Sequence, residues 1–156
     1  MHRNLIFFWM KRAACCLSFF LVFAQASESQ ASIRKNDAQF VVIRGHQFQV
    51  EVVRTDAEWS KGLMFRERLG AREGMLFFGK FEQPRSFWMK NTYVPLDIIF
   101  ISKDLKIVDI GKNATPLSEA SIPSKAPAMH VLEVLAGTSD QLGFQPGDKV
   151  EFKLKN

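Results

Sequence analysis

The segment from Phe87 to Asp97, FWMKNTYVPLD, holds the densest group of chemically useful side chains in the sequence. Lys90, Asn91 and Thr92 can each hydrogen-bond to a ligand or to backbone, and Asp97 directly precedes an apolar run. Buried polar groups in folded proteins are nearly always hydrogen-bonded and so held in place. We therefore predict a binding site in this segment, and the alternative interpretation is a structural Asx-type turn.

Trp88 and the basic residues around the segment have two interpretations each. A buried Trp88 would add apolar area to the core, which is the favoured interpretation, whereas in a cleft it would stack on a flat ligand such as a sugar. Arg66 and Arg68 flank Glu67, and with Lys90 and other basic residues they could line an anion-binding surface. The alternative for these charges is a solvated turn.

Carboxylates offer the best catalytic interpretation. Asp97 and Glu133 could serve as acid and base, with Lys90 tuning the pKa of one of them. No serine lies in a Gly-x-Ser-x-Gly elbow, which disfavours a serine hydrolase. No residue is assigned as catalytic from the sequence.

Methionine and histidine raise a third function, copper handling. The residues concerned are Met64, Met75, Met89, Met129, His46 and His130. Thioether and imidazole ligands suit Cu(I), but no Met-x-Met or His-x-x-His spacing occurs, and methionine ordinarily fills cores. We therefore predict neither a metal site nor a cofactor.

The first 26 residues are typical of an export signal. Basic residues at positions 3, 11 and 12 precede an apolar stretch of 11 residues, 13–23, and Ala24-Gln25-Ala26 forms a cleavage site. The apolar stretch is shorter than the roughly 20 residues that span a bilayer, so no stable membrane span is expected after cleavage. We expect a periplasmic or secreted protein, and the alternative is a protein anchored by its uncleaved signal.

Removal of the signal changes the composition of the chain. Cys15 and Cys16 leave with it, which excludes disulfides, thiolate metal sites and a cysteine nucleophile from the mature protein. Of 21 Lys and Arg, three lie in the signal, which leaves 18 against 16 Asp and Glu. Binding to nucleic acid needs a clustered basic face, and here the charges alternate in sign. We predict no nucleic-acid partner, and we expect an unknown small molecule or a component of the cell envelope.

The polar residues 27–38 are predicted to be a flexible lead-in to a single domain, residues 39–156. In residues 47–54, Phe48, Val50 and Val52 alternate with polar residues, which indicates a half-buried strand. Strands are predicted over residues 39–43, 47–54, 75–78, 86–89, 97–102, 106–110, 130–136 and 149–154.

Two short helices are predicted between the strands. Thr55 and Glu58 have the spacing of a capping box for a helix that ends at Gly62, and Thr138 with Gln141 repeats the pattern for a turn ending at residue 143. Residues 111–128 contain three prolines and should form a long surface loop that closes the site. The predicted fold class is α+β, mostly β: a small single-domain β-barrel or sandwich with two short helices.

Six motifs occur in order along this domain: GLMFR (62–66), GMLF (74–77), FWMKNT (87–92), PLDIIF (95–100), VLEV (131–134) and GDxV (147–150). In these motifs the chain resembles the domain of unknown function 192 family, over about residues 40–152. The resemblance implies a compact β-rich α+β domain and carries no biochemical activity.

The resemblance places the candidate ligand-binding positions at Met64, Arg66, Trp88, Lys90, Asn91, Thr92, Asp97 and Glu133. His130 stands where the family leads us to expect an aromatic residue such as Tyr, which disfavours a metal or general-base role for it. The leading hypothesis is an exported ligand-binding or accessory domain of the cell envelope. The alternative is a small envelope hydrolase or lyase that uses Asp97 with Lys90 or Glu133.

Overall fold

The structure is a computed structural model that describes residues 39–155. The predicted signal peptide and lead-in, residues 1–38, lie outside the described residues. From Gln39 onward the chain forms one compact unit. Within the described range, no helix is long and apolar enough to cross a membrane.

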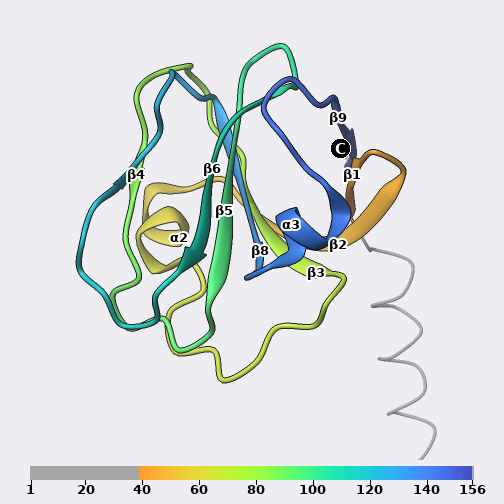
Figure 1. The fold of residues 1–156 in the computed structure, drawn as a ribbon. Helices are drawn as coiled ribbons and strands as arrows, with labels where there is room; N and C mark the ends of the chain where they lie inside the picture. Colours follow the sequence, from red (N-terminus) through yellow and green to blue (C-terminus); the bar gives the residue numbers. More distant parts are fainter. Residues whose placement is uncertain (1–38, 156) are drawn as a thin grey trace, which may run out of the picture. The chain divides into compact units, whose positions relative to one another are not determined.

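Nine strands and two short helices make up this described part of the chain (Figure 1). In order they are β1 (Gln39–Ile43), β2 (His46–Val53), α2 (Asp56–Lys61), β3 (Glu73–Phe77), β4 (Ser86–Phe87), β5 (Leu96–Ile101), β6 (Ile107–Ala114), β7 (Ile122–Pro123), β8 (His130–Leu135), α3 (Thr138–Leu142) and β9 (Val150–Lys153). The protein is therefore mostly β with two short helices, which confirms the predicted fold class.

Seven strands form one curled sheet in the order β6-β5-β8-β3-β2-β1-β9, and β4 pairs only with β7. Within the large sheet β2 and β3 are parallel, and the other pairs are antiparallel. The two edge strands meet where Ile107 N–H donates to the carbonyl of Asp148 at 2.9 Å. The sheet is therefore curled far enough for its first and last strands to touch at one end, as in a partly closed barrel.

The curl divides the apolar residues into two cores. The inner core lies inside the curl and takes residues from both edge strands, including Ile107 of β6 and Val150 of β9. The outer core lies on the other face, under α2 and the segments between strands, and includes Phe77, Met89 and Val131. The central strands β5 and β8 are buried on both faces, because successive side chains of a strand point to opposite sides.

Local sequence signals account for the hairpin and the first helix. Arg44 and Gly45 both have positive φ angles, 49° and 79°, as a two-residue hairpin turn between twisted strands requires. The capping box of α2 is formed as predicted, with the Glu58 amide donating to Thr55 Oγ1 at 3.3 Å and Thr55 N–H donating to the Glu58 carboxylate at 2.9 Å. Gly62 ends the helix, which confirms that prediction.

Two local predictions were wrong. The N-cap of α3 is Gly137, which has no side chain, so the capping box expected from Thr138 is not formed. Residues 111–128 are not a continuous loop, because β6 extends to Ala114 and β7 pairs with β4. Both errors arise from partners that are distant in the sequence and leave no local signal.

Candidate functional site

A cavity of about 290 Å³ opens on the outer-core side of the sheet. It lies between the end of α2, the strands β3, β4 and β8, and the chain just after β4. Its lining residues are Trp59, Ser60, Lys61, Gly62, Leu63, Met64, Phe77, Ser86, Phe87, Trp88, Thr92 and Glu133. A volume of this size is at the small end of the range for ligand sites, which begins at about 300 Å³.

Three aromatic rings form one wall of the cavity. The ring of Phe77 lies edge-to-face against Trp59 at 5.3 Å and against Phe87 at 5.0 Å between centroids. Gly62 lies against this wall, and a Cβ there would be 3.2 Å from Cζ of Phe77. Its φ angle of 45° also favours glycine. The wall is therefore rigid and tightly packed where α2 ends.

Glu133 is the buried acidic residue of the cavity. It lies in the middle of β8, opposite Met75 of β3 and Ile98 of β5, and only 4% of its surface is exposed. No hydrogen bond or ion pair to its carboxyl group is formed within residues 39–155. Burial raises the pKa of Glu133 from 4.5 to about 8, so its carboxyl group keeps a proton at neutral pH.

The hydroxyl groups of the cavity already use their protons inside the protein. Ser60 Oγ donates to the carbonyl of Asp56 at 2.9 Å, and Thr92 Oγ1 donates to the carbonyl of Lys90 at 3.2 Å. Each hydroxyl has one proton, so both oxygens can only accept a hydrogen bond from a ligand.

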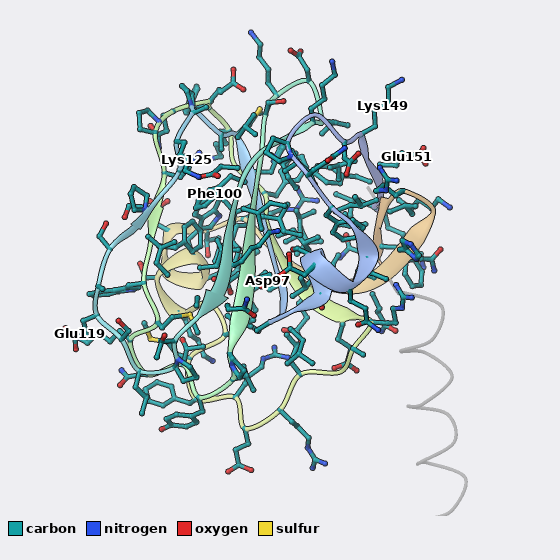
Figure 2. The ribbon with its side chains drawn as sticks, viewed as in Figure 1. Asp97, Phe100, Glu119, Lys125, Lys149 and Glu151 are labelled. Carbon is teal, nitrogen blue, oxygen red and sulfur yellow. The ribbon has the colours of Figure 1, made fainter. Side chains whose placement is uncertain are left out.

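The structure brings half of the eight predicted positions to the cavity: Met64, Trp88, Thr92 and Glu133. Lys90 lies beside it, with Nζ 5.1 Å from the ring centre of Trp88 and 3.7 Å from a carboxylate oxygen of Glu119. Glu119 itself lies at the periphery of the molecule (Figure 2).

Arg66 and Asn91 support the surroundings of the cavity. The guanidinium of Arg66 pairs with the carboxylate of Glu51. Asn91 has a positive φ angle of 53°, and its carbonyl accepts the N–H of Phe65 at 2.8 Å. The Asn91 backbone therefore ties the chain after β4 to the chain after α2.

Asp97 lies on the opposite face of the sheet from the cavity. Its carboxylate accepts backbone N–H bonds from Asn113 at 2.9 Å, from Gly137 at 3.2 Å and from Ser139 at 2.8 Å. Figure 2 shows Asp97 beside α3, whose first turn it caps. The carboxylates of Asp97 and Glu133 therefore point to different sides of the sheet and form no acid–base pair.

Sequence reasoning missed the aromatic wall. Trp59, Phe77 and Phe87 come from a helix and two strands that lie apart in the sequence. One signal was present: Trp59 is the only large apolar residue of α2, a helix with no fully buried residue. A lone tryptophan on such a helix must either pack against a sheet or line a cleft.

The long segment predicted to close the site lies against it without entering it. Ser118 carbonyl accepts the N–H of Met89 at 2.9 Å, and Leu117 N–H donates to the carbonyl of Thr92 at 3.1 Å. No residue of the segment 111–128 lines the cavity. The segment therefore holds the chain after β4 in place.

His130, one of the residues considered for copper, has an internal role on the inner-core face. Its Nδ1 accepts the N–H of Gly79 at 3.2 Å. Burial, together with the positive charges of Arg85 and Arg54, lowers its pKa to about 4. Over residues 39–155 no three His, Cys, Asp or Glu side chains are grouped so that they could hold a metal ion.

A second cavity, of about 540 Å³, lies on the other side of Trp59. Arg85 lies there with its guanidinium 4.8 Å from the Trp59 ring centre. It donates to the carbonyls of Phe81 at 2.8 Å and Ala128 at 3.1 Å, so its hydrogen bonds hold the protein together. Trp59 therefore lines both cavities.

Comparisons with known proteins agree with this fold. The family model described as Uncharacterized ACR, DUF192 (domain of unknown function 192), matches residues 39–152. A protein of unknown function from Novosphingobium aromaticivorans DSM 12444, solved at 1.22 Å resolution, is 45% identical with a TM-score of 0.70, and the match covers 72% of this chain and 83% of that chain.

A second solved structure, described as a candidate transcription regulator from Sinorhizobium meliloti 1021, is 41% identical with a TM-score of 0.70. That match covers 74% of this chain and 94% of the other. No curated protein matches the chain. The family match covers both helices and all of the sheet except the last residue of β9, and it coincides with the range indicated by the sequence motifs; the chain belongs to the DUF192 family.

Proposed function

We propose that this protein is an exported small-molecule-binding domain of the cell envelope, and that its ligand occupies the cavity beside Glu133. The observation that carries the proposal is the carboxyl group of Glu133, which lines the cavity, belongs to a residue that is only 4% exposed and has no hydrogen-bond partner within residues 39–155. A nearly buried carboxyl group that meets a cavity without a protein partner is commonly associated with a function. A bound ligand would supply the missing partner.

The walls of the cavity support the same proposal. Trp59, Phe77 and Phe87 supply apolar contact area, and Ser60 and Thr92 supply oriented polar atoms. Apolar walls combined with fixed polar groups are common in small-molecule sites.

A ligand screen by saturation-transfer NMR tests the proposal. Protein purified from cells that express the full chain should bind members of a library of small fragments, and binding should be lost in a Trp59→Ala or Phe87→Ala variant. Trp59 is half-buried, so thermal unfolding must first show that each variant is folded. Glu119→Gln, an exposed change outside the cavity, is the matched control. Equal binding by the control and both cavity variants would contradict the proposal.

Export is supported by the N-terminal sequence, with its basic residues, short apolar stretch and Ala24-Gln25-Ala26. Expression of the full chain in a Gram-negative host, followed by fractionation and intact-mass measurement, tests it. We expect a periplasmic product that begins at Ser27. A product of full mass in the membrane fraction would instead support the uncleaved anchor.

The transcription-regulator description of the Sinorhizobium protein does not alter the proposed ligand class. Nucleic-acid binding depends on a clustered set of unpaired basic residues. Here Arg44, Arg66 and Lys112 each pair with a carboxylate. We therefore propose a small molecule and no nucleic acid as the partner.

A hydrolase or lyase is the second candidate function, and the observation that favours it is the burial of Glu133 in the cavity lining, which raises the pKa of its carboxyl group. A carboxylic acid with a pKa of about 8 can donate a proton at neutral pH. Its predicted partner Asp97 lies on the other face of the sheet, so the acid would act without a second carboxylate. Turnover of glycans or cell-wall fragments, lost in Glu133→Gln, would support this function. Absence of turnover between about pH 4 and pH 9 would contradict it.

A further inference from the structure

Two hydroxyl groups of the cavity, those of Ser60 and Thr92, are matched to a ligand that donates hydrogen bonds. The hydroxyl protons of Ser60 and Thr92 are committed to backbone carbonyls, so their oxygens face a ligand as acceptors. Ser86 Oγ shares a hydrogen bond with Ser121 Oγ at 2.7 Å.

The ionisable groups near the cavity also bear on the class of ligand. Glu133 is its one acidic lining residue and Lys61 its one basic lining residue. Lys61 lies at the exposed end of α2 and makes no ion pair with the carboxyl group of Glu133. The groups packed around Glu133 from β3 and β5, Met75 and Ile98, carry no charge. A positive ligand group would therefore be the first ion-pair partner of the Glu133 carboxylate.

Aromatic faces complete the match. Phe77 and Phe87 line the cavity, and aromatic faces attract cations. Lys90 and Arg85 already lie over the rings of Trp88 and Trp59. The two phenylalanines are therefore the rings left without a protein cation.

The volume indicates the size of the ligand group that fits inside the cavity. A water molecule has a share of about 30 Å³ in the liquid, so a cavity of about 290 Å³ holds on the order of ten water-sized groups. A single small ring with a short side chain fits this volume.

We propose that the cavity takes a small protonated amine with an apolar body, whose ammonium group pairs with the Glu133 carboxylate and whose body contacts Phe77 and Phe87. This inference rests on the proposed function, because it names the ligand class of the same cavity. Thr92 and Ser60 would accept the remaining ammonium protons.

Binding of such a ligand releases a proton. In the empty cavity at neutral pH, Glu133 is protonated because burial raises its pKa to about 8. When an ammonium ion enters, the Glu133 proton passes to the buffer and the carboxylate pairs with the intact ammonium group. The affinity should therefore rise about tenfold per pH unit below pH ~8 and then level off.

Isothermal titration calorimetry tests the ligand class. The probes are benzylamine and 2-phenylethylamine, with benzyl alcohol and 2-phenylethanol as uncharged partners of the same shape. Titrations in two buffers of different ionisation enthalpy, at several values between about pH 6 and pH 8.5, count the protons released. We expect the amines to bind at least about tenfold more tightly than the alcohols at pH ~8, with nearly one proton released at pH ~7.

Glu133→Gln provides the decisive variant. Glutamine has the shape of the protonated acid and no charge, so the fold should be retained. We expect it to lose amine affinity by about tenfold or more, to abolish proton release and to keep any weak binding of the alcohols. Glu51→Gln, an exposed carboxylate paired with Arg66, is the matched control and should change nothing.

Three outcomes would overturn the inference. One is an amine affinity that is constant up to about pH 8 and falls above it, which would mean that the ligand binds the protonated form of Glu133 and forms no ion pair with it. Another is equal binding of amines and alcohols. The third is binding of other fragment classes in the cavity while no amine binds, in which case the proposed function stands without this ligand class. If no fragment binds at all, the proposed function and the inference both fall.

Discussion

Asp97 and Glu133 are two buried acidic residues on adjacent strands, and their carboxyl groups differ in their hydrogen-bond partners. Asp97 is fully buried on the inner-core face, where three backbone N–H groups donate to it. Glu133 is 4% exposed on the outer-core face, where no group among residues 39–155 donates to it. The first carboxyl group is held by the framework of the fold, and the second is the group to which we assign a ligand in our proposal.

Burial alone therefore does not identify a functional residue. Both residues are surrounded by apolar strand neighbours in the sequence. Only the hydrogen-bond partners separate them, because a buried carboxyl group with several donors stabilises the fold, whereas one without donors destabilises its charged form.

The largest effect is expected at the satisfied carboxylate. Asp97→Ala should lower the free energy of unfolding by about 3 kcal/mol or more, because it leaves three buried or partly buried N–H groups without an acceptor. Urea unfolding followed by circular dichroism measures this. The control is Asp140→Ala, an exposed carboxylate on α3 that pairs with Lys112 and should cost under about 1 kcal/mol. Equal losses of unfolding free energy in the two variants would contradict the structural role assigned to Asp97.

The second effect is a pH dependence at the unsatisfied carboxyl group. The folded-state pKa of Glu133, about 8, lies above its ordinary value of 4.5. The folded state therefore binds more protons, and this contribution to stability is complete below pH 4.5 and is lost as the pH rises through about 8. The unfolding free energy of wild type should fall relative to Glu133→Gln by about 1.4 kcal/mol per pH unit in this window.

Unfolding of both proteins at several pH values between about 5 and 8 provides the measurement. The lowered pKa of His130 gives a slope of opposite sign below its ordinary value of 6.5, and subtracting one protein from the other removes that contribution. Parallel stability curves for the two proteins would show that Glu133 is not protonated in the folded state.

A smaller effect is expected at Thr92 on the cavity side. Thr92→Val removes the hydrogen bond to the Lys90 carbonyl and should lower the unfolding free energy by about 1 kcal/mol. The same variant should weaken amine binding by several-fold, since it removes an acceptor. Thermal unfolding and titration with benzylamine give the two values, and unchanged binding would place the ligand away from Thr92.

The smallest effect is expected beside Asp97. Ser139 donates its backbone N–H to Asp97, while its buried Oγ has no partner within the described part of the chain. Ser139→Ala should therefore keep the unfolding free energy within about 1 kcal/mol of wild type. A larger loss, measured by urea unfolding, would reveal a hidden partner for the hydroxyl group.

The parts of the fold that were predictable from the sequence depend on short-range signals. The hairpin at Arg44 and Gly45 and the capping box of Thr55 and Glu58 involve residues within four positions of each other. The motif order also identified the family, because each motif is short and local. The alternation in residues 47–54 correctly placed Phe48, Val50 and Val52 on one face, where they belong to or pack against the inner core.

The candidate site was only half predictable for the same reason. Asp97 was expected to act within its own turn or with Lys90, but its partners Gly137 and Ser139 are about 40 residues away. The cavity depends on Trp59 meeting Phe77 and Phe87, and no sequence pattern specifies which rings meet across a curled sheet. Long-range contacts of this kind are visible only in the folded chain.

The position of Trp59 in the lining of the cavity has a practical consequence. The sequence contains three tryptophans, one in the predicted signal and the other two, Trp59 and Trp88, in the lining of the cavity. After removal of the signal, all indole emission would come from two residues that line the cavity. Tryptophan fluorescence would then report whether the cavity is occupied.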